Sequence, residues 1–193
     1  MTGAVSRDSG LHATAVIHGE TGVLILGPSG SGKSALALAL MARASGVGAF
    51  CALIGDDRIY VRKAKGRLVA SGAPNMAGII ERRMAGLIAV RHEPAAVVRL
   101  AVELSERGRR LPRMPDDDDG VIILGVKLPR LALDSSLSVC DQALAVDERL
   151  AVLAAENPGR AAISLDHSAA VHKNAPPEIS SPGLFGAGGE PIG

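Results

Sequence analysis

Aromatic residues are scarce in this chain of 193 residues, which has one tyrosine, two phenylalanines and no tryptophan. Proteins that bind single-stranded nucleic acid stack the bases on aromatic side chains, so the scarcity argues against that class of partner. The chain also has no large excess of positive or negative charge, because its 21 basic and 20 acidic side chains leave a net charge of +1. A strong field toward DNA or an anionic membrane needs a larger imbalance, and we therefore expect neither as a partner.

Cysteines and long apolar runs are equally few. Cys51 and Cys140 lie on apolar stretches without the spacing of a metal or redox motif, so we expect both to be buried, reduced thiols. The sequence lacks an apolar run of about 18 residues, and Ser6, Arg7 and Asp8 stand where a signal peptide would be apolar. We expect a soluble protein of the cytoplasm.

The composition changes near residue 157. Hydrophobic residues make up 47% of the chain, which is enough for an aliphatic core in one domain. Residues 157–193, however, contain five prolines and six glycines, and such a segment cannot easily build a core. We predict one folded domain over residues 1–156 and a disordered tail over residues 157–193.

A phosphate-binding loop is the most informative motif of the chain. Residues 27–34 read Gly-Pro-Ser-Gly-Ser-Gly-Lys-Ser, and they follow the apolar run of residues 23–26. The pattern G-x-x-x-x-G-K-[ST] between a strand and a helix is typical of proteins that bind nucleoside triphosphates. The residues predicted to bind the nucleotide are Gly27, Pro28, Ser29, Gly30, Ser31, Gly32, Lys33 and Ser34.

Each residue type that this loop pattern specifies has a chemical task. Glycine lets backbone N–H groups approach phosphate oxygens without interference from a Cβ atom. Lys33 is expected to reach the β- and γ-phosphates of ATP, and Ser34 to offer its hydroxyl to Mg²⁺. The helix that begins here adds the positive end of its dipole.

The apolar pattern around the loop predicts a partly parallel α/β sheet. We expect a buried helix over residues 33–44, with glycines after it, and a second helix near residues 137–155. A charged loop is expected over residues 105–120. Strands are predicted at residues 11–18, 23–26, 49–54, 58–62, 67–70, 86–90 and 97–103, and one or two more within 121–133.

Asp56 and Asp57 follow the predicted strand of residues 49–54. Open α/β sheets bind ligands at the carboxyl ends of their strands, which is where these carboxylates would lie. A carboxylate there can hold Mg²⁺ or its water, or take a proton from an attacking hydroxyl. The competing interpretation is an ordinary solvated turn, because Asp-Asp is common in turns.

Further segments, in their order and spacing, resemble one family. The chain resembles the catalytic C-terminal domain of HPr kinase/phosphorylase, a bifunctional regulator that phosphorylates a serine of the phosphocarrier protein HPr. The resemblance covers about residues 11–150, and no single motif beyond the phosphate loop decides it. Its segments are Leu11-His12-Ala13-Thr14, residues 22–34, Leu53-Ile54-Gly55-Asp56-Asp57, Gly72-Ala73-Pro74, residues 80–86 (close to the family's E-x-R-G-x-G) and residues 124–129.

The resemblance implies a fold, a reaction and a set of site residues. The fold would be the P-loop architecture similar to phosphoenolpyruvate carboxykinase, with a central mixed sheet flanked by helices. The reaction would be the transfer of a phosphoryl group from ATP, with Mg²⁺, to HPr of the phosphotransferase system, within a homo-hexamer. By position, His12, Lys33, Asp56, Asp57 and Arg113 would be catalytic, and Ser34 and Glu81 would be metal ligands. Of the two aspartates we favour Asp57 as the proton acceptor, with Asp56 as the alternative.

The chain departs from the family pattern at several points. We expect the short form of the family, without its N-terminal domain. Ala35 stands where the family has glutamate, Met84 replaces a signature glycine, and the segment P-V-R-P-G-R-N, linked to the phosphorylase reaction, has no counterpart. These departures favour the kinase direction over the phosphorylase direction. They also leave open a kinase of a small metabolite, or a module that senses nucleotide without phosphoryl transfer.

Overall fold

The phosphate loop joins a central strand to the first helix of an α/β fold. The computed structural model describes residues 10–106 and 120–156, which belong to one compact unit. None of the helices in these ranges is long and apolar enough to cross a membrane. The elements, in order, are β1 (Leu11–His12), β2 (Thr14–His18), β3 (Thr21–Leu26), α1 (Lys33–Gly46), β4 (Cys51–Gly55), β5 (Arg58–Ala64), β6 (Arg67–Gly72), a 3-10 turn (Pro74–Met76), β7 (Ile79–Arg82), β8 (Gly86–Ala89), β9 (Ala95–Leu104), β10 (Gly120–Ile123), β11 (Val126–Leu133) and α2 (Val139–Ala155).

Nine strands form one mixed sheet in the order β1-β5-β6-β9-β3-β2-β4, and β11 joins it beside β9 and pairs in turn with β10. The pairs β3–β9 and β9–β11 are parallel, whereas the remaining pairs of this sheet are antiparallel. The prediction of a partly parallel central sheet is therefore confirmed. The three parallel strands end on the same side, where the phosphate loop begins.

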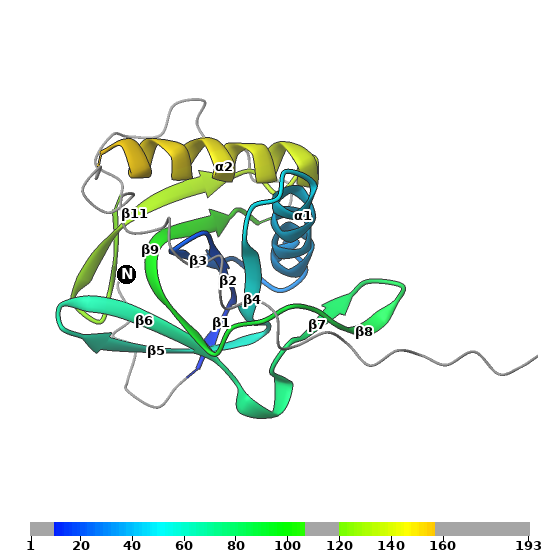
Figure 1. Cartoon of the computed structure of the whole chain (residues 1–193), viewed down its shortest axis with the longest axis horizontal. Coiled ribbons are helices and arrows are strands. Elements are labelled where there is room, and N and C mark those ends of the chain that lie inside the picture. The colour runs from blue at the N-terminus through cyan, green and yellow to red at the C-terminus, as the bar shows by residue number, and fades with distance from the viewer. Residues whose placement is uncertain (1–9, 107–119, 157–193) are drawn as a thin grey trace, which may run out of the picture. The chain divides into compact units, whose positions relative to one another are not determined.

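Both helices flank one face of the sheet, as Figure 1 shows. Leu36 and Leu40 of α1 and Val146 of α2 are fully buried in one cluster with Val23 and Leu100 of the sheet. The apolar composition of α1 predicts burial on all sides of the helix, but Ala42, Arg43 and Ser45 are exposed. It is covered by the sheet on one side and by α2 on another.

The other face of the central strands is covered by further strands of the same sheet. Ile59 of β5, Leu68 of β6 and Leu128 of β11 are buried in a second cluster with Leu24 of β3. The long strand β9 reaches both layers, since its first half pairs with β6 and its second half with β3 and β11. In Figure 1 this strand bends between the two layers.

A separate two-stranded hairpin, β7–β8, extends from the sheet (Figure 1). Strand β8 matches the strand predicted near residues 86–90, but β7 was not predicted from the sequence. Its four residues are too few to show a clear alternation, and only Ile80 among them is fully buried.

The prediction for the two cysteines is half correct. Both are free, and Cys51 on β4 is buried. Cys140, on the first turn of α2, is exposed instead of buried. The first turn of α2 also exposes Val139, so apolar sequence there does not imply a core position.

Candidate functional site

The phosphate loop lies between the end of β3 and the beginning of α1. Gly32 precedes the helix with φ +103°, in the left-handed region that glycine adopts without strain. At Gly27 a Cβ atom would lie 2.8 Å from the Leu104 carbonyl oxygen and 2.8 Å from Ser31 Oγ. The loop therefore requires glycine at both positions, for backbone conformation at one and for close packing at the other.

Lys33, the first residue of α1, is buried, and its ammonium group contacts both the loop and His12. Its Nζ donates to the carbonyl oxygens of Gly27 and Pro28, each at 3.0 Å, and contacts His12 Nε2 at 3.0 Å. These three acceptors match the three hydrogens of an ammonium group. Burial lowers the pKa of Lys33, while the carboxylates of Asp56 and Asp57 act in the opposite direction.

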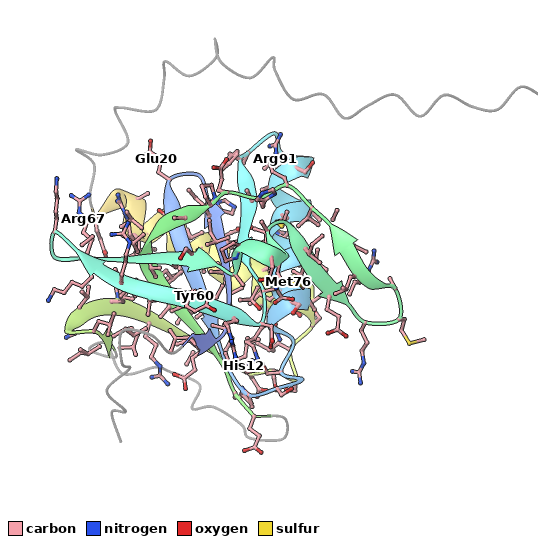
Figure 2. All side chains as sticks on the ribbon, turned by 90° about the horizontal axis from the view of Figure 1, so that it is seen from below. His12, Glu20, Tyr60, Arg67, Met76 and Arg91 are labelled. Atoms are coloured by element: carbon pink, nitrogen blue, oxygen red, sulfur yellow. The ribbon has the colours of Figure 1, made fainter. Side chains whose placement is uncertain are left out.

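His12 links Lys33 to Asp57. Its Nε2 faces the lysine and its Nδ1 lies 2.9 Å from Asp57 Oδ1. Because the ammonium of Lys33 can only donate, Nε2 must accept, and the ring proton is then on Nδ1 and directed at Asp57. His12 is the last residue of β1, and in Figure 2 it lies on the opposite side of the molecule from Glu20, which belongs to the turn between β2 and β3.

Asp56 is held by donors from three separate elements. Its Oδ1 accepts the hydroxyl of Thr14 on β2 at 2.6 Å, and both carboxylate oxygens lie 2.9–3.0 Å from the hydroxyl of Ser34 on α1. Its Oδ2 also accepts the backbone N–H of Glu81 on β7 at 3.3 Å. These contacts fix the carboxylate beside the beginning of α1.

The two neighbouring aspartates therefore have different surroundings. Asp57 has 82% of its side chain exposed and contacts His12, whereas Asp56 is half-buried and surrounded by donors. The backbone of Asp57 has φ +63°, a left-handed conformation that aspartate tolerates better than most residues and that is frequent at functional sites. This turn directs successive side chains to different partners.

Most of the predicted site residues come together around the loop: His12, Lys33, Ser34, Asp56 and Asp57 form one connected set of contacts. Glu81 reaches this set only through its backbone N–H in the contacts above, and its side chain is exposed on the β7–β8 hairpin. Arg113 lies outside the described residues.

The oxygen atoms near Ser34 fit a magnesium ion chemically. Mg²⁺ prefers oxygen ligands and keeps several waters, so a hydroxyl, one carboxylate and nucleotide phosphates suffice to hold it. Ser34 and Asp56 offer the hydroxyl and the carboxylate side by side. Among the residues that the structure describes, no group of three or more His, Cys, Asp or Glu side chains is arranged to hold a metal.

One residue of this site was missed by the sequence reasoning. Thr14 is fully buried and makes the shortest of the contacts to Asp56 described above, yet the sequence pattern alone assigns it no role. A signal was available, because a threonine at the start of an apolar strand beside a predicted site must pair its hydroxyl once it is buried.

Several known proteins have similar sequences. Residues 4–137 match the family described as HPr Serine kinase C-terminal domain. An HPr kinase/phosphorylase from Caldicellulosiruptor bescii is 32% identical over 133 residues, which are 63% of this chain and 40% of that protein. The HPr kinase/phosphorylase of Bacillus subtilis is 28% identical over 142 residues, which are 65% of this chain and 44% of that protein. The chain thus spans less than half the length of these curated relatives.

A solved structure has the same fold. The Hpr(Ser) kinase/phosphatase from Coxiella burnetii aligns with a TM-score of 0.58 and 26% identity, over 75% of this chain and 99% of that one. The family match extends over more than half of the chain and includes the phosphate loop, His12 and both aspartates. This chain belongs to the family of HPr serine kinase C-terminal domains.

Proposed function

We propose that this chain is an ATP- and Mg²⁺-dependent serine kinase that phosphorylates the phosphocarrier protein HPr in the cytoplasm. The observation that carries the proposal is the contact chain Asp57–His12–Lys33 at the mouth of a complete phosphate loop. A module that only senses nucleotide needs the loop but has no use for an exposed carboxylate oriented by a histidine. Membership of the family supports HPr as the acceptor.

The loop and Lys33 bind the triphosphate. Backbone N–H groups of residues 27–34 and the beginning of α1 attract phosphate oxygens. When the nucleotide binds, Lys33 would exchange its contacts with Gly27 O and Pro28 O for contacts with phosphate oxygens. In this role it neutralises the charge of the transferring phosphoryl group, and Arg113 is proposed to assist.

Ser34 and Asp56 are the residues that would hold Mg²⁺, and we extend the metal site to Glu81 as the resemblance implies. When bound, the ion neutralises charge on the phosphates and aligns them for transfer. Asp56 accepts the hydroxyl hydrogen of Ser34, which leaves the oxygen lone pairs of Ser34 available for a cation.

Asp57 is the proposed proton acceptor. Its exposed carboxylate can take the proton of the incoming serine hydroxyl as the oxygen of that serine attacks the γ-phosphoryl group of ATP. The bond from that phosphorus to the bridging oxygen breaks, and ADP leaves. The Nδ1–H of His12 orients the carboxylate, and the engagement of Asp56 by three donors makes Asp56 the poorer base. We propose the kinase direction alone, because the segment linked to the phosphorylase reaction has no counterpart.

The decisive experiment is phosphoryl transfer to HPr. Purified protein is incubated with Mg²⁺·ATP and HPr, and the site and number of added phosphates are determined by mass spectrometry. We expect one phosphate on a serine of HPr, and none when Lys33→Ala replaces the wild type. Binding of ATP without transfer to HPr would instead favour a sensor or a kinase of a small metabolite. The hexamer implied by the resemblance is tested by measuring the mass of the protein in solution.

A further inference from the structure

The hydroxyl of Thr14 carries an inference beyond the family's site residues. Thr14 opens β2, next to the chain that carries His12, and has no exposed surface. Its Oγ1 donates to Asp56 Oδ1 at 2.6 Å, the shortest of the contacts to that carboxylate. A buried hydroxyl aimed at an ionised acceptor forms a charge-assisted hydrogen bond, which is stronger than a neutral one.

An irregularity in strand pairing makes this contact possible. Strands β2 and β4 are antiparallel, with Ala15 opposite Gly55 and Val16 opposite Leu53. Ile54 is therefore the extra residue of a bulge, which changes the side-chain alternation just before Asp56. Beyond Ala15 and Gly55, the next residues along the two strands are Thr14 and Asp56, and their side chains meet.

The contact determines which way the hydroxyl of Ser34 points. Thr14 donates to one oxygen of Asp56, and the carboxylate accepts the hydroxyl of Ser34 at 2.9 and 3.0 Å. Since Ser34 has one hydroxyl hydrogen, its donation to Asp56 leaves both lone pairs of its oxygen for a cation. Without Thr14, the carboxylate of Asp56 loses a donor and can rotate away from Ser34.

We propose that Thr14 is a positioning residue that sets the affinity for the Mg²⁺-nucleotide complex by orienting Asp56 and, through it, the hydroxyl of Ser34. The proposal rests on the metal role given to Ser34 and Asp56 in the proposed function. It does not depend on HPr, because it concerns binding of the nucleotide and not transfer of the phosphoryl group.

The test measures binding of ADP by titration calorimetry to the wild-type chain of 193 residues and to its variants. Each protein is titrated once with Mg²⁺ and once with EDTA. The ratio of the two affinities is the gain from Mg²⁺. Thr14→Val keeps the shape and removes the hydroxyl, and we expect the gain to fall about tenfold, the equivalent of about 1.4 kcal/mol. The affinity in EDTA should stay within about twofold of wild type, and Thr14→Ser should restore the gain.

Thr21→Val is the matched control, because Thr21 lies at the opposite end of the β2–β3 hairpin, paired with His18 and away from the phosphate loop. Its gain from Mg²⁺ should equal that of wild type. Thr14→Cys, which retains a weak donor in similar space, should give an intermediate gain and serves if Thr14→Val does not fold.

Several outcomes would overturn the proposal. One is a wild-type gain in Thr14→Val, and another is an equal loss of affinity with and without Mg²⁺, which indicates a general structural role. Failure of both Thr14→Val and Thr14→Cys to fold, or absence of any gain in the wild type, would also reject it. If the binding results are as expected but HPr is not phosphorylated, the proposed kinase function is rejected and the proposal for Thr14 stands.

Discussion

Asp56 and Asp57 are adjacent in the chain but have different chemical surroundings, and their substitution should separate two steps. Asp57→Asn removes the exposed carboxylate while leaving the contacts of Asp56 with Thr14 and Ser34 in place. We expect turnover to fall by a factor on the order of 10²–10⁴, the usual contribution of a general base, with Mg²⁺·ADP affinity within about twofold of wild type. Steady-state kinetics with HPr and calorimetry with ADP measure the two quantities.

Asp56→Asn provides the reciprocal comparison. This substitution replaces a carboxylate that accepts from Ser34 and Glu81 by an amide, so the Mg²⁺-dependent part of ADP affinity should fall as well as turnover. If the two variants showed the opposite assignment, with binding lost in Asp57→Asn and retained in Asp56→Asn, their roles would have to be exchanged.

The two thiols should differ strongly in reactivity. Burial, and after it the carboxylate of Asp147, raises the pKa of Cys51 to about 12. At pH 8 only about one in ten thousand such thiols is ionised, and the thiolate is the species that reacts. We expect Cys140, which is exposed, to be alkylated by iodoacetamide at pH 8, with Cys51 slower by a factor on the order of 10³ until the protein is unfolded in urea. Peptide mapping by mass spectrometry identifies each site, and equal rates in the native protein would contradict the burial of Cys51.

At the scale of elements, the β7–β8 hairpin contains a residue in an unfavourable backbone conformation. Met84 has φ +70° and a fully exposed side chain, in a turn closed by the N–H of Ala85 donating to Arg82 O. It is the third residue of that turn, where a positive φ favours glycine. The signature glycine of the family at this position thus has a physical reason, which Met84 does not satisfy.

Substitutions of Met84 should therefore change stability in opposite directions. Met84→Gly relieves the left-handed strain and exposes no core, so the free energy of unfolding should be unchanged or higher by up to about 1 kcal/mol. Met84→Val, with a β-branched side chain, should lower it by about 1 kcal/mol. Urea unfolding curves measure both values, and a destabilised Met84→Gly variant would show that the methionine side chain makes a stabilising contact.

At the scale of the whole molecule, residues 1–156 form one compact unit of the chain. A chain that ends at Glu156 should accordingly keep its melting temperature within about 5 °C of the full chain and bind Mg²⁺·ADP with the same affinity. Differential scanning calorimetry and titration with ADP test this, and a larger loss would show that residues 157–193 contribute to the folded domain.

Local patterns allowed the phosphate loop and α1 to be predicted closely, because a strand, a glycine-rich turn and a helix follow one another along the chain. The parallel pairing of β3 with β9 joins residues more than seventy positions apart, and periodicity does not reveal such partners. The division of roles proposed for Asp56 and Asp57 depends in the same way on distant Thr14 and on the bulge at Ile54. Cys140 was misjudged because apolar neighbours in sequence are not neighbours in space.

Strand β9 has a thermodynamic consequence for the molecule. Ala96 and Val98 belong to one hydrophobic cluster, whereas Leu100, Val102 and Leu104 belong to the other. Unfolding of one cluster removes β9 from the other cluster as well. Heat should therefore unfold both clusters in a single cooperative transition. The backbone amides of this strand should then exchange with deuterium only through global opening, and be among the last in the protein to do so.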